Sequence, residues 1–219
     1  MNKGEVIASA KDFVNQQLMG ESSGHDAWHV IRVWKTAKAI AEIEGANVFI
    51  VELSALLHDV YDWKFYDEEI RVFETRKWLY RHNVSDSNIA EIIYIIENIS
   101  YKGNRKAKEL KTIEAKIVQD ADRLDALGAI GIARAFAYGG HKDRQIYDPY
   151  IPTDFIPNVV TSSSPSTIHH FYEKLLLLKN EFHTKTATEL AMQRHEFIKE
   201  FLNQFYLDWN LEISSRVAM

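Results

Sequence analysis

The sequence predicts an all-α fold, a helical bundle with one long irregular loop, built as a single domain over residues 1–219. In most of the chain, apolar side chains recur every three to four residues, which is the spacing of one face of an α-helix. The chain has only nine Gly and four Pro, and this composition disfavours both disorder and an all-β fold. A chain of this length can also bury a sizeable core.

The first five helices follow from their apolar spacing and from the residues at their ends. Gly20–Gly24 interrupts the pattern after the first helix, and Gly45 ends the second. Asn47 can cap the third helix, and Ser85 or Asp86 can cap the fifth. In chain order, the apolar patterns of these helices cover residues 3–19, 30–41, 51–57, 67–81 and 86–99.

Three further helices are expected in the second half of the chain, over residues 112–137, 167–180 and 184–210. Thr112 and Glu114 stand near the start of the first of them. Residues 138–165 contain two glycines and all four prolines, so this stretch forms the irregular loop. A loop of this length can be a lid over a binding site or a passive surface excursion, and both interpretations remain open.

Charge and composition disfavour several classes of protein. The net charge of -5 and the pI near 6.0 give no electrostatic reason to expect a nucleic-acid partner. Because there is no cysteine, neither disulfides nor thiolate metal sites can form. No stretch approaches the roughly eighteen apolar residues of a membrane span, and residues 1–19 lack the apolar core of a signal peptide. We therefore expect a cytoplasmic protein without a membrane partner.

His58 and Asp59 stand side by side at the end of the apolar run of residues 53–57. Burying such a polar pair is costly unless the groups are hydrogen-bonded or bind a metal ion. A metal ion needs further ligands from other elements of the fold. Two segments carry the candidates: His25, Asp26 and His29 in the second helix region, and Asp120, Asp122 and Asp125 in residues 119–125.

Helical spacing supports a shared site, because His25 and His29, and likewise Asp122 and Asp125, lie on one face of a helix. The alternative for any single residue is a helix cap, an ion pair or a satisfied core group. The three acids after Gln119 lie in an otherwise apolar segment, which is not the pattern of a solvated face. From spacing alone, the sequence indicates a divalent-metal site.

Five segments of the chain resemble a known family. They are residues 25–33 (HDAWHVIRV), 56–59 (LLHD), 99–103 (ISYKG), 119–136 (QDADRLDALGAIGIARAF) and 170–175 (HFYEKL). The order His29, His58-Asp59, Asp122 is similar to the H…HD…D signature of the HD-domain metal-dependent phosphohydrolases. The chain most resembles a compact, stand-alone bacterial subgroup of them, similar to nucleoside triphosphate pyrophosphohydrolases, over nearly its whole length.

The resemblance implies one divalent ion, held by His29, His58, Asp59 and Asp122. Mn, Mg, Fe, Co, Ni and Zn all suit two imidazoles and two carboxylates, and the resemblance favours Mn. Asp120 fits the pattern less well than Asp122. Asp62 would orient or deprotonate the attacking water, although capping or pairing with Lys64 is its alternative role.

The resemblance also suggests residues around this ion. Asp26 would hydrogen-bond a ligating imidazole and fix its tautomer. For Arg123 the alternative is a structural ion pair with Asp120 or Asp125. The candidates for binding the substrate phosphates are Lys64, Lys102, Arg105, Arg123 and His25.

The implied activity is hydrolysis of nucleoside or deoxynucleoside triphosphates to the monophosphate and pyrophosphate, by attack of metal-bound water on the α-phosphorus. The partner would be a small phosphorylated nucleotide, and a homodimer remains open. A 5'-nucleotidase or a phosphodiesterase would use the same centre. The alternative from another class is a non-catalytic nucleotide-sensing module.

Overall fold

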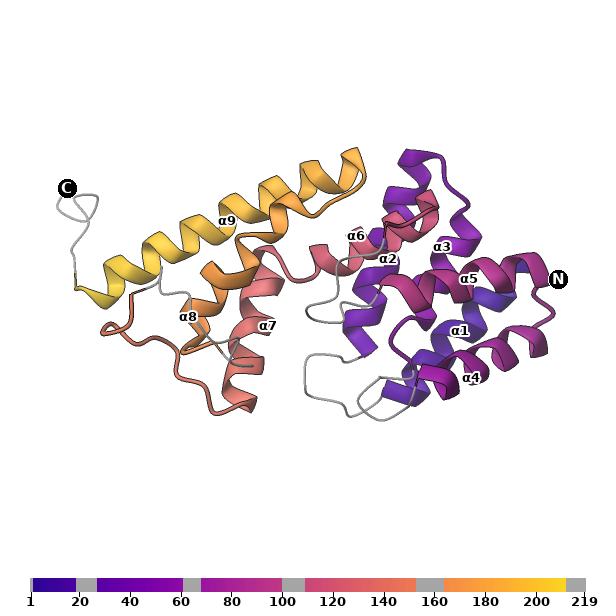
Figure 1. Ribbon diagram of the computed structural model, residues 1–219, viewed down its shortest axis with the longest axis horizontal. Coiled ribbons are helices and arrows are strands. Elements are labelled where there is room, and N and C mark those ends of the chain that lie inside the picture. Colours follow the sequence, from indigo (N-terminus) through magenta and orange to yellow (C-terminus); the bar gives the residue numbers. More distant parts are fainter. Residues whose placement is uncertain (1, 19–26, 61–67, 100–108, 153–163, 212–219) are drawn as a thin grey trace. The chain divides into compact units, whose positions relative to one another are not determined.

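The computed structural model describes residues 2–18, 27–60, 68–99, 109–152 and 164–211, and in these residues the regular structure is entirely helical (Figure 1). The all-α prediction is therefore confirmed. The chain divides into two compact units, one of Met1–Asp125 with Phe182–Ala187 and one of Ala126–Glu181 with Thr188–Met219. The expectation that residues 1–219 act as one domain stays a prediction.

The first unit is a bundle built around α3 (Val48–Leu57), of which nine residues are buried. Helix α3 packs against α1, α2, α5 and α6, because nearly all of its side chains are apolar and it has no solvated face. The other helices of this unit are α1 (Lys3–Leu18), α2 (Ala27–Glu44), α4 (Glu68–Arg81), α5 (Asp86–Ile99) and α6 (Ile113–Leu124).

The predicted signals at Gly45 and Asn47 are confirmed, whereas Gly20–Gly24 lies outside the described residues and the cap at Ser85 or Asp86 stays a prediction. Gly45 ends α2 with a φ of 71°, a left-handed conformation that glycine adopts without strain. The Asn47 side chain caps α3 by accepting the N–H of Ile50 (3.5 Å), and the Thr112 hydroxyl caps α6 by accepting the N–H of Ala115 (3.3 Å). The two caps place the starts of α3 and α6, whose opposite ends carry His58 and Asp122.

One predicted helix is wrong: residues 112–137 form two helices. Helix α6 ends at Leu124, and α7 runs from Gly128 to His141. Leu127 is extended (φ -116°, ψ 163°) and Gly128 has a φ of 69°, so the helical hydrogen-bond ladder cannot continue between them. The apolar spacing runs across this break, which is why periodicity alone did not detect it. Helix α7 also extends four residues, 138–141, into the expected loop, 138–165.

The second unit contains α7, α8 (Thr167–His170) and most of α9 (Lys185–Trp209). The prediction of one helix over 167–180 is also wrong. Helix α8 continues as a π-helix at Phe171–Leu175, and a 3-10 turn follows at Leu178–Asn180. The N–H of Leu176 bonds the carbonyl of Phe171 at 2.8 Å, which is the wider turn of a π-helix.

Aromatic rings pack against one another in the second unit, around the buried Phe171. The rings of Phe136 and Phe171 lie 5.8 Å apart, and Phe171 stacks on Phe201 of α9 at 5.9 Å. Tyr147 lies edge-on to Trp209 at 5.1 Å. Such offset and edge-to-face pairs stabilise beyond the area that they bury. In the described part of the chain, no helix combines the length and apolar character needed to cross a bilayer.

Candidate metal centre

The imidazole of His29, in the first turn of α2, is held in one orientation. Its Nδ1 lies 2.7 Å from Oδ2 of Asp125, at the end of α6. Arg32 donates to both oxygens of the same carboxylate, through Nε at 2.7 Å and Nη2 at 2.9 Å. Because a carboxylate only accepts hydrogen bonds, Nδ1 carries the proton, and Nε2 keeps a lone pair for another partner. The side chain of His29 is buried.

His58, the residue after α3, is arranged in the same way by a backbone group. Its Nδ1–H donates to the carbonyl of Ala55 at 2.7 Å, which makes Nε2 the unprotonated nitrogen. That Nε2 is buried and has no hydrogen-bond partner in the described part of the chain. A buried polar atom in this condition requires an explanation, and a bound ion is one.

Two carboxylates face the same pair of nitrogens. Oδ2 of Asp59 lies 3.6 Å from Nε2 of His29 and 3.7 Å from Nε2 of His58. Oδ1 of Asp122 lies 3.3 Å and 4.0 Å from the same two atoms. The imidazole rings meet edge to face, with centroids 5.7 Å apart. Four ligand atoms from three helical regions thus converge on one point.

These separations fit a metal ion. Ligand atoms of His29, His58 and Asp59 all lie within 4.8 Å of one another, so this cluster could hold one. An ion bound at about 2.0–2.2 Å keeps neighbouring ligand atoms about 3–4 Å apart. Two neutral imidazoles with two carboxylates also suit first-row divalent ions and magnesium. The donor set therefore matches a divalent ion, without selecting one metal.

The charge of Asp122 suits this role. Withdrawal of its carboxyl from water would by itself raise the pKa, but the nearby imidazoles of His29 and His58 act against it, because either ring favours the carboxylate whenever it is protonated. The net result is a pKa of Asp122 below its ordinary value, although neighbouring Asp59 opposes the shift. At neutral pH the side chain is therefore ionised, which is the state that a metal ligand requires.

Asp120, two residues earlier on α6, has a different task. It is fully buried and accepts the backbone N–H of His183 (3.0 Å) and the N–H and hydroxyl of Thr184 (both 2.8 Å). Burial raises the pKa of this carboxyl, against the hydrogen bonds that lower it. Asp120 thus holds the start of α9, which accords with the expectation that Asp122 is the better ligand.

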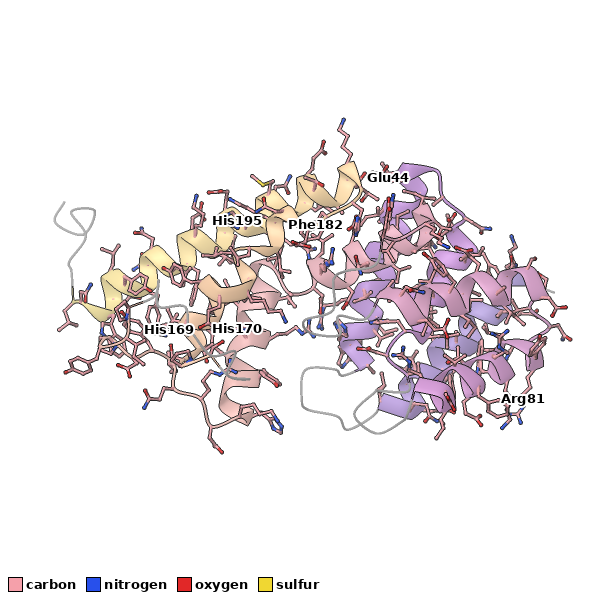
Figure 2. All side chains as sticks on the ribbon, in the orientation of Figure 1. Glu44, Arg81, His169, His170, Phe182 and His195 are labelled. Atoms are coloured by element: carbon pink, nitrogen blue, oxygen red, sulfur yellow. The ribbon has the colours of Figure 1, made fainter. Side chains whose placement is uncertain are left out.

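Glu44, at the end of α2, holds the same helix start and is labelled in Figure 2. It accepts the hydroxyl of Thr186 at 2.6 Å and its N–H at 2.9 Å, and these bonds lower the pKa of the Glu44 carboxyl. Carboxylates at a helix N-terminus are stabilised by its unpaired N–H groups. Glu44 therefore fixes residues 182–187 to the first unit together with Asp120.

Arg123 follows Asp122 directly, and its Nη1 lies 3.5 Å from Nε2 of His183. His183 in turn bonds Oε1 of Gln119 at 2.8 Å, and Gln119 donates to the carbonyl of Ile99 at 3.2 Å. The guanidinium therefore stands beside a network that joins α5, α6 and the start of α9. Its role toward phosphate stays a prediction.

Six predicted site residues lie outside the described residues, and their roles stay predictions: His25, Asp26, Asp62, Lys64, Lys102 and Arg105. Sequence reasoning named Asp125 as a possible metal ligand rather than as the partner of an imidazole, and it did not single out Arg32; the structure places both beside His29. Asp26 was the expected partner of a ligating imidazole, whereas Asp125 bonds His29. The available signal was spacing: Asp125 lies one turn after Asp122, and Arg32 lies one turn after His29.

The comparisons with known proteins agree with this geometry. The HD domain family model matches residues 27–127, which contain all four predicted ligands. The uncharacterized protein YpgQ of Bacillus subtilis is 42% identical over 200 residues, covering 90% of this chain and 91% of that protein. The chain therefore belongs to the HD-domain superfamily of metal-dependent phosphohydrolases.

Two solved structures are similar to nearly the whole chain. An HD-superfamily hydrolase from Bacillus thuringiensis is 42% identical with a TM-score of 0.78, covering 95% of this chain and 99% of that one. The structure of Bacillus subtilis YpgQ in complex with ADP is 38% identical with a TM-score of 0.74, covering 92% and 97%. The likeness thus extends beyond the matched domain to both compact units.

Proposed function

We propose that this phosphohydrolase cleaves nucleoside or deoxynucleoside triphosphates to the monophosphate and pyrophosphate. The observation that carries the proposal is the buried Nε2 of His58, which has no hydrogen-bond partner in the described residues and faces His29, Asp59 and Asp122. A nucleotide as substrate is supported by YpgQ, which was crystallised with ADP. The specific scissile bond rests on the resemblance of the sequence to nucleoside triphosphate pyrophosphohydrolases.

In this proposal His29, His58, Asp59 and Asp122 hold one divalent ion. When bound, such an ion lowers the pKa of a coordinated water and neutralises charge on phosphoryl oxygens. Asp125 and Arg32 keep Nε2 of His29 directed at the site by holding its Nδ1. The protein thus fixes both imidazoles before the ion arrives, which reduces the reorganisation that binding requires.

The remaining residues of the proposal act on the attacking water and on the substrate. Asp62 orients a water and accepts its proton as the oxygen attacks the α-phosphorus. The bond from the α-phosphorus to the oxygen that bridges to the β-phosphate breaks, and its electron pair leaves with pyrophosphate. Arg123, Lys64, Lys102, Arg105 and His25 are the candidates that offset the growing negative charge of the leaving group.

The test is to purify the chain, measure its bound metal, and assay a nucleotide panel in which phosphate and pyrophosphate are measured separately. We expect pyrophosphate without phosphate from a triphosphate, and no turnover in Asp59→Ala. Phosphate release from monophosphates would select a 5'-nucleotidase, and cleavage of a cyclic or dinucleotide would select a phosphodiesterase. Nucleotide binding without turnover under any metal would favour the sensing module and contradict the enzyme.

A further inference from the structure

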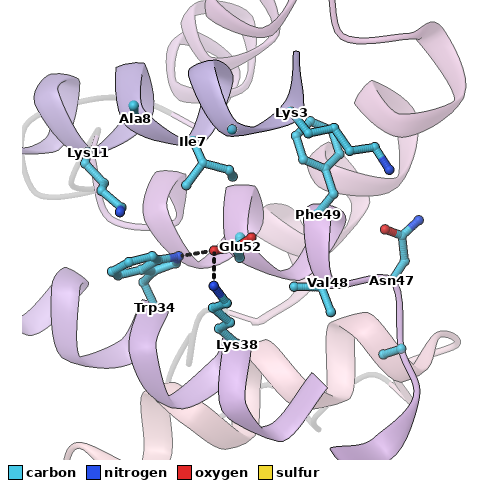
Figure 3. Close-up of a pocket in the computed structure, with 12 residues that line it drawn as sticks. Lys3, Ile7, Ala8, Lys11, Trp34, Lys38, Asn47, Val48, Phe49 and Glu52 are labelled. Carbon is cyan, nitrogen blue, oxygen red and sulfur yellow. Dashed lines mark hydrogen bonds and ion pairs between the residues drawn. The ribbon is translucent and has the colours of Figure 1, made fainter. Parts of the chain in front are cut away.

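A hollow opens in the first unit, where α1 meets α2 and α3 (Figure 3). It has a volume of about 660 Å³, which is within the usual range for small-molecule sites. Its walls contain none of the four predicted metal ligands. Glu52 lines the hollow six residues before His58 on α3, so the two sites are separated by about 9 Å along that helix.

The charged residues in its walls are three lysines, Lys3, Lys11 and Lys38, and one acid, Glu52. Glu52 is buried, and its carboxylate is already satisfied: Nε1 of Trp34 donates to it at 3.0 Å, and Nζ of Lys38 lies 3.8 Å away. Figure 3 draws these two contacts as dashed lines. The carboxylate of Glu52 is thus paired with Lys38. Lys3 and Lys11 remain as two further positive charges in the walls of the hollow.

Lys11 and Lys3 are each positioned over an aromatic ring. Nζ of Lys11 lies 3.9 Å from the ring centroid of Trp34, and Nζ of Lys3 lies 5.3 Å from that of Phe49. In the described part of the chain, neither lysine has a carboxylate partner. A cation over an aromatic face is attracted to it, so both ammonium groups are kept at the walls of the hollow.

Backbone dipoles add to this positive potential. Helices α1 and α3 both begin at the hollow, at Lys3 and Val48, and the N-terminus of a helix carries a partial positive charge. The nearby Glu114 accepts the N–H of Asn47 at 2.9 Å, just before α3, so its carboxylate offsets part of this potential. Ile7, Val48 and Phe49 give the hollow an apolar wall between the lysines.

We propose that this hollow binds a small organic anion, with a phosphate or carboxylate head toward Lys11 and an apolar body against Ile7 and Val48. Lys3, about 12 Å further along α1, attracts the same ligand by its charge. An anion is selected because the walls of the hollow carry three lysines and a single acid. The apolar body follows from the wall, which a bare inorganic ion would leave exposed to water.

Trp34 provides the measurement, because its indole N–H donates to Glu52 inside the hollow. The probe is 1-naphthyl phosphate, titrated into the full chain while the Trp34 indole N–H resonance is followed by NMR. The resonance is assigned through Trp34→Phe. We expect a saturable shift, and an affinity lowered about tenfold or more in Lys3→Ala/Lys11→Ala, equivalent to ~1.4 kcal/mol or more. Raising the salt concentration should also weaken binding.

The chain offers a matched control. Lys77 lies 5.6 Å from the ring of Phe73, and Lys142 lies 5.8 Å from the ring of Tyr138, so each repeats the lysine-over-ring contact away from the hollow. Lys77→Ala/Lys142→Ala should therefore bind the probe as the unmodified chain does. If the control loses affinity to the same extent, the effect is one of overall charge and the proposal fails.

Two further ligands complete the test. Binding of 1-naphthoate in place of the phosphate identifies a carboxylate head, while preference for the phosphate identifies a phosphate head, and either result supports the site. Inorganic phosphate should bind much more weakly, because it lacks the apolar body. A Trp34 resonance that does not move, an unchanged affinity in Lys3→Ala/Lys11→Ala, or equal binding of inorganic phosphate would each overturn the proposal.

Discussion

Two buried histidines, one in each compact unit, differ in the number of ring nitrogens that hydrogen-bond to the described part of the protein. His169 of α8, labelled in Figure 2, bonds with both ring nitrogens, to Oγ of Ser166 at 2.7 Å and to the carbonyl of Ile151 at 3.0 Å. Among the described residues, His58 has only the Nδ1 bond to Ala55. An unsatisfied buried polar group costs about 1–3 kcal/mol, so the second arrangement indicates a partner still to be supplied.

His195 of α9 sharpens this comparison. It too is buried with one nitrogen, Nδ1, that has no hydrogen-bond partner in the described residues. Burial lowers the pKa of His195, and Lys179 and Lys199 act in the same direction. Among the described residues, the group that could hold a metal is His29, His58 and Asp59. An unpartnered nitrogen therefore indicates a metal site only where carboxylates converge on it.

The largest expected effect is that of His58→Ala. We expect it to lose bound metal and activity together, by more than about a hundredfold, because even residues that only orient a ligand cost 10–100-fold. Metal content and turnover should be measured on the same preparation. Retained metal with full activity would contradict the assignment. The fold should persist, as judged by circular dichroism, because the removed imidazole makes one bond to the protein.

His169→Ala should give the opposite result. It leaves the Ser166 hydroxyl and the Ile151 carbonyl without their buried partner, so we expect a loss of about 2–4 kcal/mol in the free energy of unfolding. Metal content should stay unchanged. Urea denaturation with metal analysis checks both. A loss of metal without a loss of stability would remove the distinction between the two histidines.

Asp125→Asn tests how His29 is oriented. The amide can still accept the Nδ1–H, but it cannot balance the charge of Arg32, so we expect metal affinity to fall about 10–100-fold, less than for His58→Ala. Competition with a chelator measures the affinity. Arg81→Gln, a change on the exposed end of α4, is the control and should leave it unchanged. An unaltered affinity in Asp125→Asn would limit Asp125 to a structural ion pair.

The smallest expected effect concerns His170, whose pKa is lowered to about 4 by burial and by the nearby charges of Lys174 and Arg144. In the unfolded chain the pKa of a histidine is about 6.5. Between these values the unfolded chain binds a proton that the folded chain does not, so this contribution to stability is complete above pH ~6.5 and is lost as the pH falls toward 4.

His170→Gln should therefore flatten the loss of stability with falling pH in that window. Denaturation series at several pH values measure the slope. His141→Gln alters an exposed histidine at the end of α7 and should leave the slope as it is. If the slope in His170→Gln equals that of the unmodified chain, the burial of this imidazole does not cause the pH dependence. A reduced slope with unchanged metal content would separate this effect from the metal centre of the other unit.

Much of the candidate site was predictable because its residues lie within short, recognisable segments. His29, His58, Asp59 and Asp122 were predicted as ligands, and the structure brings their side chains together. Asp125 and Arg32 were not assigned their role, since a contact between residues 93 positions apart depends on how α2 packs against α6. Local spacing shows which face a side chain occupies, but not which distant group it meets.

The features of the fold can likewise be separated into those that local sequence sets and those that tertiary packing sets. Local chemistry alone determined the caps at Asn47 and Thr112, the end of α2 at Gly45 and the helical class, because these depend on bonds within a few residues. Only the tertiary structure decided the break between Leu124 and Gly128 and the π-turn at Phe171, where apolar spacing continues while the backbone changes. It also decided which nitrogen of His29 faces the site, because packing brings the Asp125 carboxylate to the other nitrogen, whereas the Ala55 carbonyl that orients His58 lies only three residues earlier.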